Sequence, residues 1–361
     1  MTKANIRAHR VPAHGGRRED AARRYGIPKE EILDFSASIS LLGPPPGVAA
    51  AIRGAAVEIS HYPEEHAEGL VEQMAAYLGV SAAQVVPGNG SIEIIYWLIK
   101  AINPARALIV EPTFSEYRRA CLSAGAACDS FSLQEDENFA FDVQMLQPQR
   151  YDLIFLCNPN NPTGYLVPVD DIAWLWQKCL AAGAGLVVDE AFIDFAGVGA
   201  SILALGSGEG LYVVRSFTKS HALAGLRLGC LVAEPGFAAQ LRKIMPPWNI
   251  NVFARAAGEA ALADTRYLYE ARSENTKERS RLWRDLDGLP GLDPLPSEAN
   301  FVLCRLRNLG SAELADRLGR MGILVRDCRS FADLGERFIR VAVRSRRENY
   351  QLVAALEKAL K

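Results

Sequence analysis

The sequence predicts an α/β protein whose large domain has a mostly parallel sheet covered by helices, followed by a smaller α/β C-terminal domain. Short, almost entirely apolar runs rich in β-branched residues are typical of strands buried on both faces of a sheet. They alternate with helical stretches such as 91–102 and 169–183, and such alternation favours parallel pairing. The predicted strands of the large sheet are 107–112, 151–159, 185–192, 211–217 and 226–233.

Three regions are predicted along the chain. Residues 1–40 form an N-terminal arm that we expect to pack on the small domain and the active site. LLGPPPG at 41–47 ends the arm, because consecutive prolines exclude helix there. Residues 41–255 form the large domain. Residues 256–361 form the small domain, with an exposed charged helix at 265–289, strands at 300–306, 322–328 and 338–344, and helices at 311–322 and 347–360.

Composition and charge exclude several classes of protein. The 361 residues include 40 Lys and Arg against 42 Asp and Glu, so the chain lacks the bulk positive charge of a nucleic-acid binder. No apolar run approaches the ~18 residues that a membrane span needs, and the first residues lack the apolar core of a secretory signal. We therefore expect a cytoplasmic protein with no membrane and no nucleic-acid partner.

Two smaller features concern partners and metals. Residues 1–24 hold seven basic and two acidic side chains, which suits a solvated arm, an arm that supplies cations to an anionic ligand, or a nucleic-acid arm. The seven cysteines are scattered and contain no CxxC pair, so no zinc or other metal site is expected. Most lie beside apolar residues, as reduced core cysteines of a cytosolic protein do.

The segment SFTKSHALAGLRLGC at 216–230 is the most informative one. Lys219 directly follows a predicted strand, and a lysine becomes a covalent catalyst when it forms a Schiff base with an aldehyde. Ser216, Thr218 and Arg227 could donate charge-assisted hydrogen bonds to a phosphate. A surface lysine and arginine would be equally consistent with this segment alone.

Three other segments add polar groups at strand or helix ends. Asn161, in NPNNPTG, is either a rigidly held amide or part of a proline-rich turn. Asp189 ends a buried strand, where α/β folds place ligands, and a buried carboxylate needs a cationic partner. GNGSIE at 88–93 is either a turn or an anion site at a helix N-terminus, and Glu93 replaces the third glycine of a dinucleotide fingerprint.

Together these residues specify one cofactor, pyridoxal 5′-phosphate. It needs an amine for its aldehyde, a phosphate cradle, a carboxylate for its ring nitrogen and a donor to its phenolate oxygen. The ordered motifs GNGS, PTF, NPNNPTG, DEAF, SFTK and GLRLG resemble the fold-type I pyridoxal-phosphate family over nearly the whole chain. More narrowly, they are similar to the branch of histidinol-phosphate aminotransferases and threonine-phosphate decarboxylases. The resemblance implies an aspartate-aminotransferase-like fold.

The resemblance also implies roles for matching residues. Lys219 would form the Schiff base, and Asp189 would bind the protonated ring nitrogen. Asn161 would donate to the phenolate oxygen, and Phe114 would stack on the ring. Tyr62 would reach the cofactor phosphate of a neighbouring subunit, which implies a homodimer. The residues implied to hold the cofactor phosphate are Gly90, Ser91, Ser216, Thr218 and Arg227.

Two arginines indicate the substrate class. Arg340, in FIRVAVR, matches the family arginine for the substrate carboxylate, and Arg326, in GILVRDC, matches one for a substrate phosphate. Both could instead be surface arginines at strand edges. Two substrate-facing arginines suit a phosphorylated amino acid. His14 and Arg17 would close over its phosphate.

Within the branch, the decarboxylases are the closer resemblance. HGG at 14–16 resembles their opening stretch, and Phe192 stands where aminotransferases usually have tyrosine. The implied reaction converts O-phospho-L-threonine to (R)-1-amino-2-propanol O-2-phosphate for cobalamin biosynthesis. The sequence departs from the family pattern at Arg17, Ser38, Ser40 and Leu41, so a related phosphorylated or phosphonate substrate stays open.

Three alternatives accompany this prediction. A histidinol-phosphate aminotransferase would need an amino acceptor such as 2-oxoglutarate, and sequence alone does not separate it from a decarboxylase. Transcription regulators with aminotransferase-like domains carry a preceding winged-helix domain, for which the roughly 35 residues before the cofactor domain are too few. An NAD-dependent dehydrogenase is the third alternative, but the sequence lacks the GxGxxG motif of that class, and this function would leave the Lys219 segment unexplained.

Overall fold

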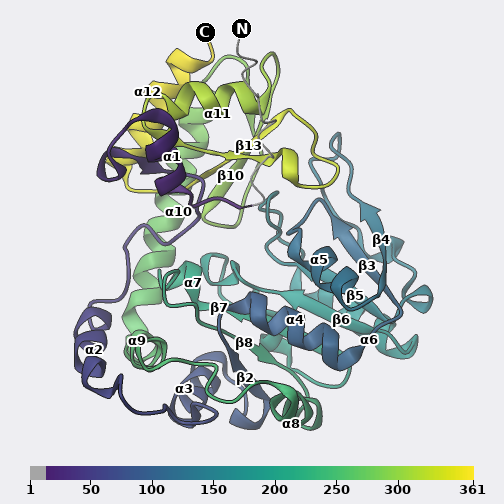
Figure 1. Ribbon diagram of the computed structural model, residues 1–361. Helices are drawn as coiled ribbons and strands as arrows, with labels where there is room; N and C mark the ends of the chain where they lie inside the picture. Colours follow the sequence, from purple (N-terminus) through teal and green to yellow (C-terminus); the bar gives the residue numbers. More distant parts are fainter. Residues whose placement is uncertain (1–13) are drawn as a thin grey trace, which may run out of the picture.

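The computed structural model describes residues 14–361, so Lys3, Arg7 and Arg10 of the basic N-terminal stretch lie outside the described residues. A seven-stranded sheet has the order β2-β8-β7-β6-β5-β3-β4 (Figure 1). Only β8 runs against its neighbours, which confirms the mostly parallel sheet. Its strands are β2 (Val85–Gly88), β3 (Arg106–Glu111), β4 (Ala127–Ser132), β5 (Leu153–Cys157), β6 (Gly185–Asp189), β7 (Leu211–Ser216) and β8 (Gly229–Val232).

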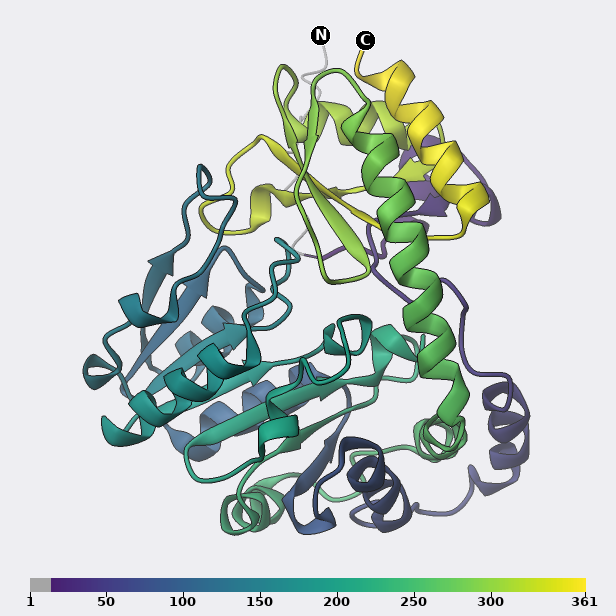
Figure 2. The same ribbon diagram turned by 180° about the vertical axis from the view of Figure 1, so that it is seen from behind.

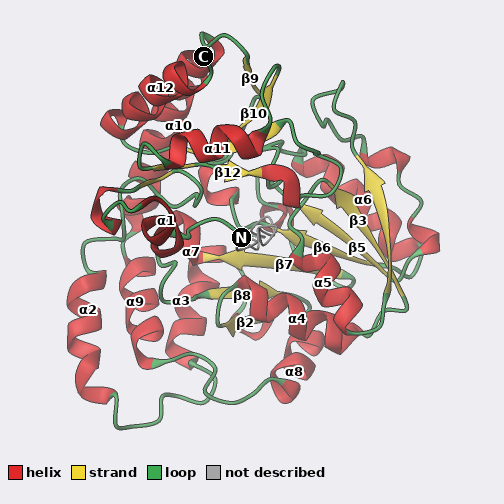
Figure 3. Cartoon of the chain, turned by 45° about the horizontal axis from the view of Figure 1, so that its top comes forward, coloured by secondary structure: helices red, strands yellow, loops and turns green. Residues whose placement is uncertain are grey.

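Helices cover both faces of this sheet (Figure 3). Side chains alternate along each strand, so Val187 of β6 packs with the cluster on one face while Leu186 and Val188 pack with the cluster on the other. The first face carries α4 (Ser91–Ile102), α5 (Glu116–Ser123) and α8 (Pro235–Ile244), and the second carries α3 (Glu68–Leu78), α6 (Val169–Ala181) and α9 (Val252–Ala263). The helix α2 (Val48–Ala55) packs on α9.

A second sheet lies above the first in Figure 1. It is antiparallel, with the order β12-β13-β10-β9. Its strands are β9 (Leu292–Pro294), β10 (Phe301–Leu306), β12 (Arg326–Asp327) and β13 (Phe338–Ala342), and its helices are α11 (Ser311–Gly319) and α12 (Arg346–Ala359). The predicted strand 322–328 is interrupted, because β11 (Ile323–Leu324) pairs elsewhere.

The long helix α10 (Thr265–Asp287) runs beside both sheets, as Figure 2 shows. It was predicted to be exposed, but Tyr267, Ala271, Leu282 and Leu286 are buried. With the buried Asn275 and Glu278 between them, the buried positions recur every three or four residues, which places one face of the helix against the protein. Charged residues dominate the remaining positions and hide this pattern in the sequence.

The described part of the N-terminal arm contacts the small sheet region. Helix α1 (Arg18–Tyr25) carries Arg24, which pairs with Asp316 of α11. β1 (Leu33–Asp34) pairs in parallel with β11. The domain boundaries at 41–255 and 256–361 stay predictions. Among residues 14–361, no helix is long and apolar enough to span a membrane.

Candidate active site

A cavity of about 250 Å³ opens at the carboxyl ends of β5, β6 and β7. The lower wall comes from the large sheet and its helices, and the upper wall from β12, β13 and the segment 36–38. Ligands of open α/β sheets bind at such strand ends. The cavity brings together ten of the predicted site residues: His14, Ser91, Phe114, Asn161, Asp189, Thr218, Lys219, Arg227, Arg326 and Arg340.

The floor of the cavity is built for an anion. Gly90 precedes α4 with φ +80°, and no side chain caps the helix, so backbone N–H groups stay available at its positive end. A Cβ on Gly90 would lie 2.6 Å from Nη2 of Arg227. The hydroxyls of Ser216 and Thr218 lie 2.7 Å apart on the same side. Glycine thus lets the arginine close on the helix terminus, as a phosphate cradle requires.

Lys219 lies in α7 (Phe217–Ser220), a single turn directly after β7. Its Nζ is 6.0 Å from the ring centre of Phe192. Burial lowers the pKa of Lys219 to about 8, helped by the positive charges of Arg340 and Arg227 and opposed by Asp189. Near neutral pH a larger fraction of this amine is therefore uncharged than in an ordinary lysine, and the uncharged form is the one that attacks an aldehyde.

Asp189 ends β6 in a buried, hydrogen-bonded position. The hydroxyl of Tyr117 donates to Oδ2 at 2.6 Å, and the Ala191 N–H donates to Oδ1 at 2.9 Å. Burial raises the pKa of Asp189, whereas these two donors and Lys219 act to lower it. The sequence analysis did not identify Tyr117. Its signal was the spacing in PTFSEY, which places Tyr117 one turn beyond Phe114 with ring centres 5.6 Å apart.

The upper wall holds two buried arginines. Arg340 of β13 donates to the side-chain oxygen of Asn161 and, at 3.3 Å, to the Ser36 carbonyl. Its Nε has no hydrogen-bond partner among residues 14–361, and burial lowers its pKa to about 10. Arg326 of β12 donates to Ser330 Oγ at 2.5 Å, and its guanidinium lies 5.2 Å from the ring centre of Phe331.

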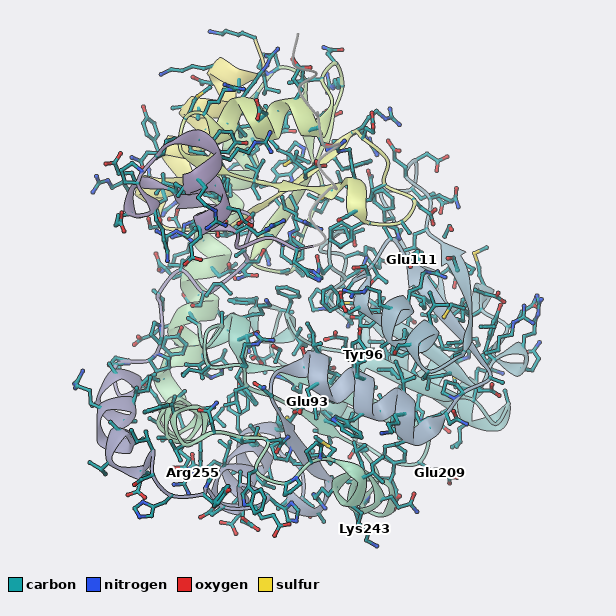
Figure 4. The ribbon with its side chains drawn as sticks, viewed as in Figure 1. Glu93, Tyr96, Glu111, Glu209, Lys243 and Arg255 are labelled. Atoms are coloured by element: carbon teal, nitrogen blue, oxygen red, sulfur yellow. The ribbon has the colours of Figure 1, made fainter. Side chains whose placement is uncertain are left out.

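His14 lies at the rim of the cavity. Its Nε2 is 2.9 Å from Oε1 of Glu116, and its ring centre is 5.7 Å from that of Phe114. Tyr96, labelled on α4 in Figure 4, donates to the other oxygen of Glu116 at 3.2 Å. Glu116, which the sequence analysis missed, therefore connects the arm to the large sheet region.

Two predicted residues lie away from the cavity of their own chain. Arg17 pairs with Asp20 and lines a neighbouring hollow, so the arm does not bring its guanidinium over the substrate space in this structure. Tyr62 is 82% exposed and packs at a tilt against Trp248, with ring centres 4.8 Å apart. Tyr62 is predicted to contact the cofactor phosphate of another subunit, and the structure of a single chain does not test this prediction.

The fold and the cavity define a pyridoxal-phosphate enzyme. The chain belongs to the aminotransferase class I and II family, whose model matches residues 30–356. Pyridoxal 5′-phosphate fits the residues present, because a phosphate cradle, a buried amine, a buried carboxylate and the Phe114 ring all face one cavity. The fold-type I architecture and the cofactor expected from the sequence are confirmed.

Two relatives and one solved structure define the branch. The chain is 36% identical to threonine-phosphate decarboxylase of Salmonella typhimurium over 96% of both chains. It is 29% identical to histidinol-phosphate aminotransferase of Methanosphaera stadtmanae, over 99% of this chain and 98% of that protein. The structure of histidinol-phosphate aminotransferase from Sinorhizobium meliloti in complex with pyridoxal 5′-phosphate superposes with a TM-score of 0.86 at 26% identity, covering 100% and 98% of the chains.

Proposed function

We propose that this enzyme decarboxylates O-phospho-L-threonine to (R)-1-amino-2-propanol O-2-phosphate. The observation that carries the proposal is the pairing of β12 and β13, in which Arg326 and Arg340 stand directly opposite each other. Like charges opposite each other in a sheet destabilise it, and both side chains are buried. A substrate with two neighbouring anionic groups offsets both charges.

The two arginines would divide the substrate between them. Arg340, with an unpartnered Nε, would hold the carboxylate through the planar fork that guanidinium presents to carboxylate. Arg326 would hold the phosphate, with His14 at the rim beside it. In phosphothreonine these groups sit on adjacent carbons, which suits side chains from neighbouring strands.

The chain's own residues prepare the reaction. Pyridoxal 5′-phosphate, when bound, supplies an electron sink for the electron pair that the departing CO₂ leaves at Cα. Asp189 would keep the ring nitrogen protonated, and Asn161 would donate to the phenolate oxygen through its amide. Lys219, with a pKa of about 8, can hold a proton near neutral pH and would deliver it to Cα.

Histidinol-phosphate aminotransferase is the second candidate, because a relative with that activity matches almost the whole chain. Phe192 argues against it, since this cavity-lining residue has no hydroxyl to offer the phenolate oxygen where aminotransferases usually have tyrosine. Histidinol phosphate also carries no carboxylate, so in that reaction Arg340 would meet a carboxylate only on the amino acceptor, such as 2-oxoglutarate.

Pathway, location and assembly complete the proposal. The product would supply the nucleotide loop of cobalamin in the cytoplasm. The working form would be a homodimer in which the exposed Tyr62 reaches the cofactor phosphate of the partner subunit.

The test is the product mass after the cofactor-loaded protein receives O-phospho-L-threonine and no 2-oxo acid. Loss of CO₂ to aminopropanol phosphate is expected. Amino transfer from histidinol phosphate to 2-oxoglutarate, with phosphothreonine untouched, would reassign the enzyme to the aminotransferases. Inactivity in both assays with the cofactor bound would favour another phosphorylated or phosphonate amino acid, bound near Ser38, whose buried hydroxyl lines the cavity and has no hydrogen-bond partner among residues 14–361.

A further inference from the structure

A buried ionic cluster lies behind the Lys219–Asp189 pair, and the reaction described above does not use it. Arg215 of β7 donates to Glu190 Oε2 at 3.1 Å and to Asp194 Oδ1. All three side chains are less than a tenth exposed. Glu190 follows Asp189 in the chain, and Arg215 precedes the cradle residue Ser216. We call Glu190, Asp194, Arg215 and Ser220 the Arg215 cluster.

Ser220 connects this cluster to the turn that carries Lys219. Its hydroxyl, fully buried, donates to Asp194 Oδ2 at 2.6 Å. The turn α7 has only four residues, too few for a helix to hold its own shape. Other segments fix it: the Ser40 N–H donates to the Lys219 carbonyl at 2.9 Å, and the Tyr267 hydroxyl donates to the Ser220 carbonyl at 3.1 Å.

Stability alone does not account for the Arg215 cluster. The free energy lost when charged groups leave water is about as large as the free energy gained when they pair. Proteins in which apolar residues of similar volume replace a buried ion pair are often as stable or more stable. The hydrogen bonds of the cluster instead fix the relative positions of two segments. One guanidinium joins the residue beside Asp189 to the residue that holds the Lys219 turn.

We infer that Arg215 and Ser220 are positioning residues, which hold Lys219 and Asp189 in register for the two ends of the cofactor through Asp194 and Glu190. The inference does not depend on the proposed substrate, because decarboxylases and aminotransferases need the same register of lysine and carboxylate. Misplacement of a reacting group by about 1 Å can cost on the order of a hundredfold in rate.

The test compares Ser220→Ala with Ser201→Ala. Ser201 is the matched control, because its hydroxyl donates to the Glu190 carboxylate at 2.6 Å and it lies outside the turn that carries Lys219. Both variants lose one hydroxyl that is bonded to a carboxylate of the cluster. Three quantities are measured: the dissociation constant for pyridoxal 5′-phosphate, the pH midpoint of the bound cofactor's absorbance, and the melting temperature of the cofactor-free protein.

For Ser220→Ala we expect about tenfold weaker cofactor binding. We also expect an upward shift of the absorbance midpoint, because a loosened Lys219 moves away from the positive charges of Arg340 and Arg227. Ser201→Ala should lower the melting temperature to a similar degree and leave both cofactor readouts unchanged, because Glu190 keeps its bonds from Arg215 and from the Ile202 N–H.

Equal cofactor readouts in the two serine variants, with equal melting temperatures, would overturn the inference and leave the cluster a purely structural feature. The variant Arg215→Lys supplies a second check, measured on the folded protein that it yields. Because Arg215 acts through Asp194, Ser220→Ala should shift the absorbance midpoint less in the Arg215→Lys background than in the native one. If the midpoint shifts of the two substitutions were strictly additive, Arg215 and Ser220 would not act through the same residue, Asp194.

Discussion

At the scale of single residues, Asp189 and Lys219 have opposed environments that suit their tasks. The carboxylate is buried, yet two donors and a nearby amine favour its charged form. The amine is buried beside two arginines, which favour its neutral form. Burial nevertheless raises the pKa of Asp189 and lowers that of Lys219, and such shifted pKa values in one cavity are typical of catalytic sites.

Replacing Tyr117 with phenylalanine removes the hydroxyl that donates to Asp189. The pKa of Asp189 then rises, because a bond that lowers it is lost. Weaker pairing with the ring nitrogen should lower kcat about tenfold while the cofactor still binds. Steady-state kinetics and the absorbance of the bound cofactor measure both effects. An unchanged kcat would exclude Tyr117 from this role.

The lowered pKa of Lys219 makes the stability of the cofactor-free protein depend on pH. Between about pH 8 and 10.5 the unfolded lysine is protonated and the folded one is neutral, so unfolding takes up a proton. Stability relative to Lys219→Met should therefore rise with pH across this window, with a limiting slope of about 1.4 kcal/mol per pH unit. Urea unfolding of both proteins at several pH values measures it. If the difference in free energy of unfolding between the two proteins did not change with pH, Lys219 would not be neutral in the folded protein. Lys219→Met should also have no turnover.

At the scale of elements, the N-terminus of α4 and the turn of Arg227 would together form the proposed phosphate cradle. Gly90 combines a positive φ with ψ 162°, a conformation nearly restricted to glycine. Arg227 itself has φ +59°, which is not a strand conformation, so the predicted strand 226–233 starts late, with β8 beginning at Gly229. The backbone on both sides is thus shaped by the anion site.

Gly90→Ala should weaken binding of pyridoxal 5′-phosphate at least tenfold, because the new Cβ displaces Arg227 from the cradle. Gly183→Ala is the matched control: its φ is +74°, but no atom lies within 4 Å of the added Cβ. Through backbone strain, Gly90→Ala should cost about 1–3 kcal/mol of stability and Gly183→Ala about 1–2 kcal/mol. Cofactor titration separates them, and equal affinities would show that the steric contact does not matter.

Elements with a clear pattern could be predicted from the sequence, and others could not. The helix 91–102 has the predicted bounds, since small residues precede it and its apolar residues are periodic. The edge strand β4, ACDSFS, was missed because it lies half exposed and lacks an apolar run. The cofactor residues follow from local motifs. Tyr117 had a local signal in the spacing of PTFSEY, but the roles of Glu116 and the Arg215 cluster depend on contacts between distant segments, which no local pattern contains.

At the scale of the whole molecule, the exposed pair Tyr62 and Trp248 suits a second copy of the chain. Large aromatic side chains left in solvent often mark an interface. The proposed dimer makes each site depend on both subunits.

Mixing Tyr62→Ala with Lys219→Ala tests this dependence. If Tyr62 acts across the interface, a hybrid dimer contains one site with native Lys219 and the native tyrosine of the other subunit. Activity should then rise on mixing. With equal amounts of the two variants and full exchange of subunits, half of the dimers are hybrids with one native site each, so activity should approach a quarter of the wild-type value if one native site works alone. A mixture no more active than its parts would indicate that Tyr62 acts within its own chain.

The pairing of β1 with β11 has a consequence for biosynthesis. Leu33 is made early by the ribosome, but its partner Ile323 appears only after most of the chain has been translated. The large sheet, complete by Val232, can fold long before that contact forms. The roof over Lys219, including Ser36 and Arg340, therefore closes last, and nascent chains should acquire cofactor-binding strands well before they acquire substrate selectivity.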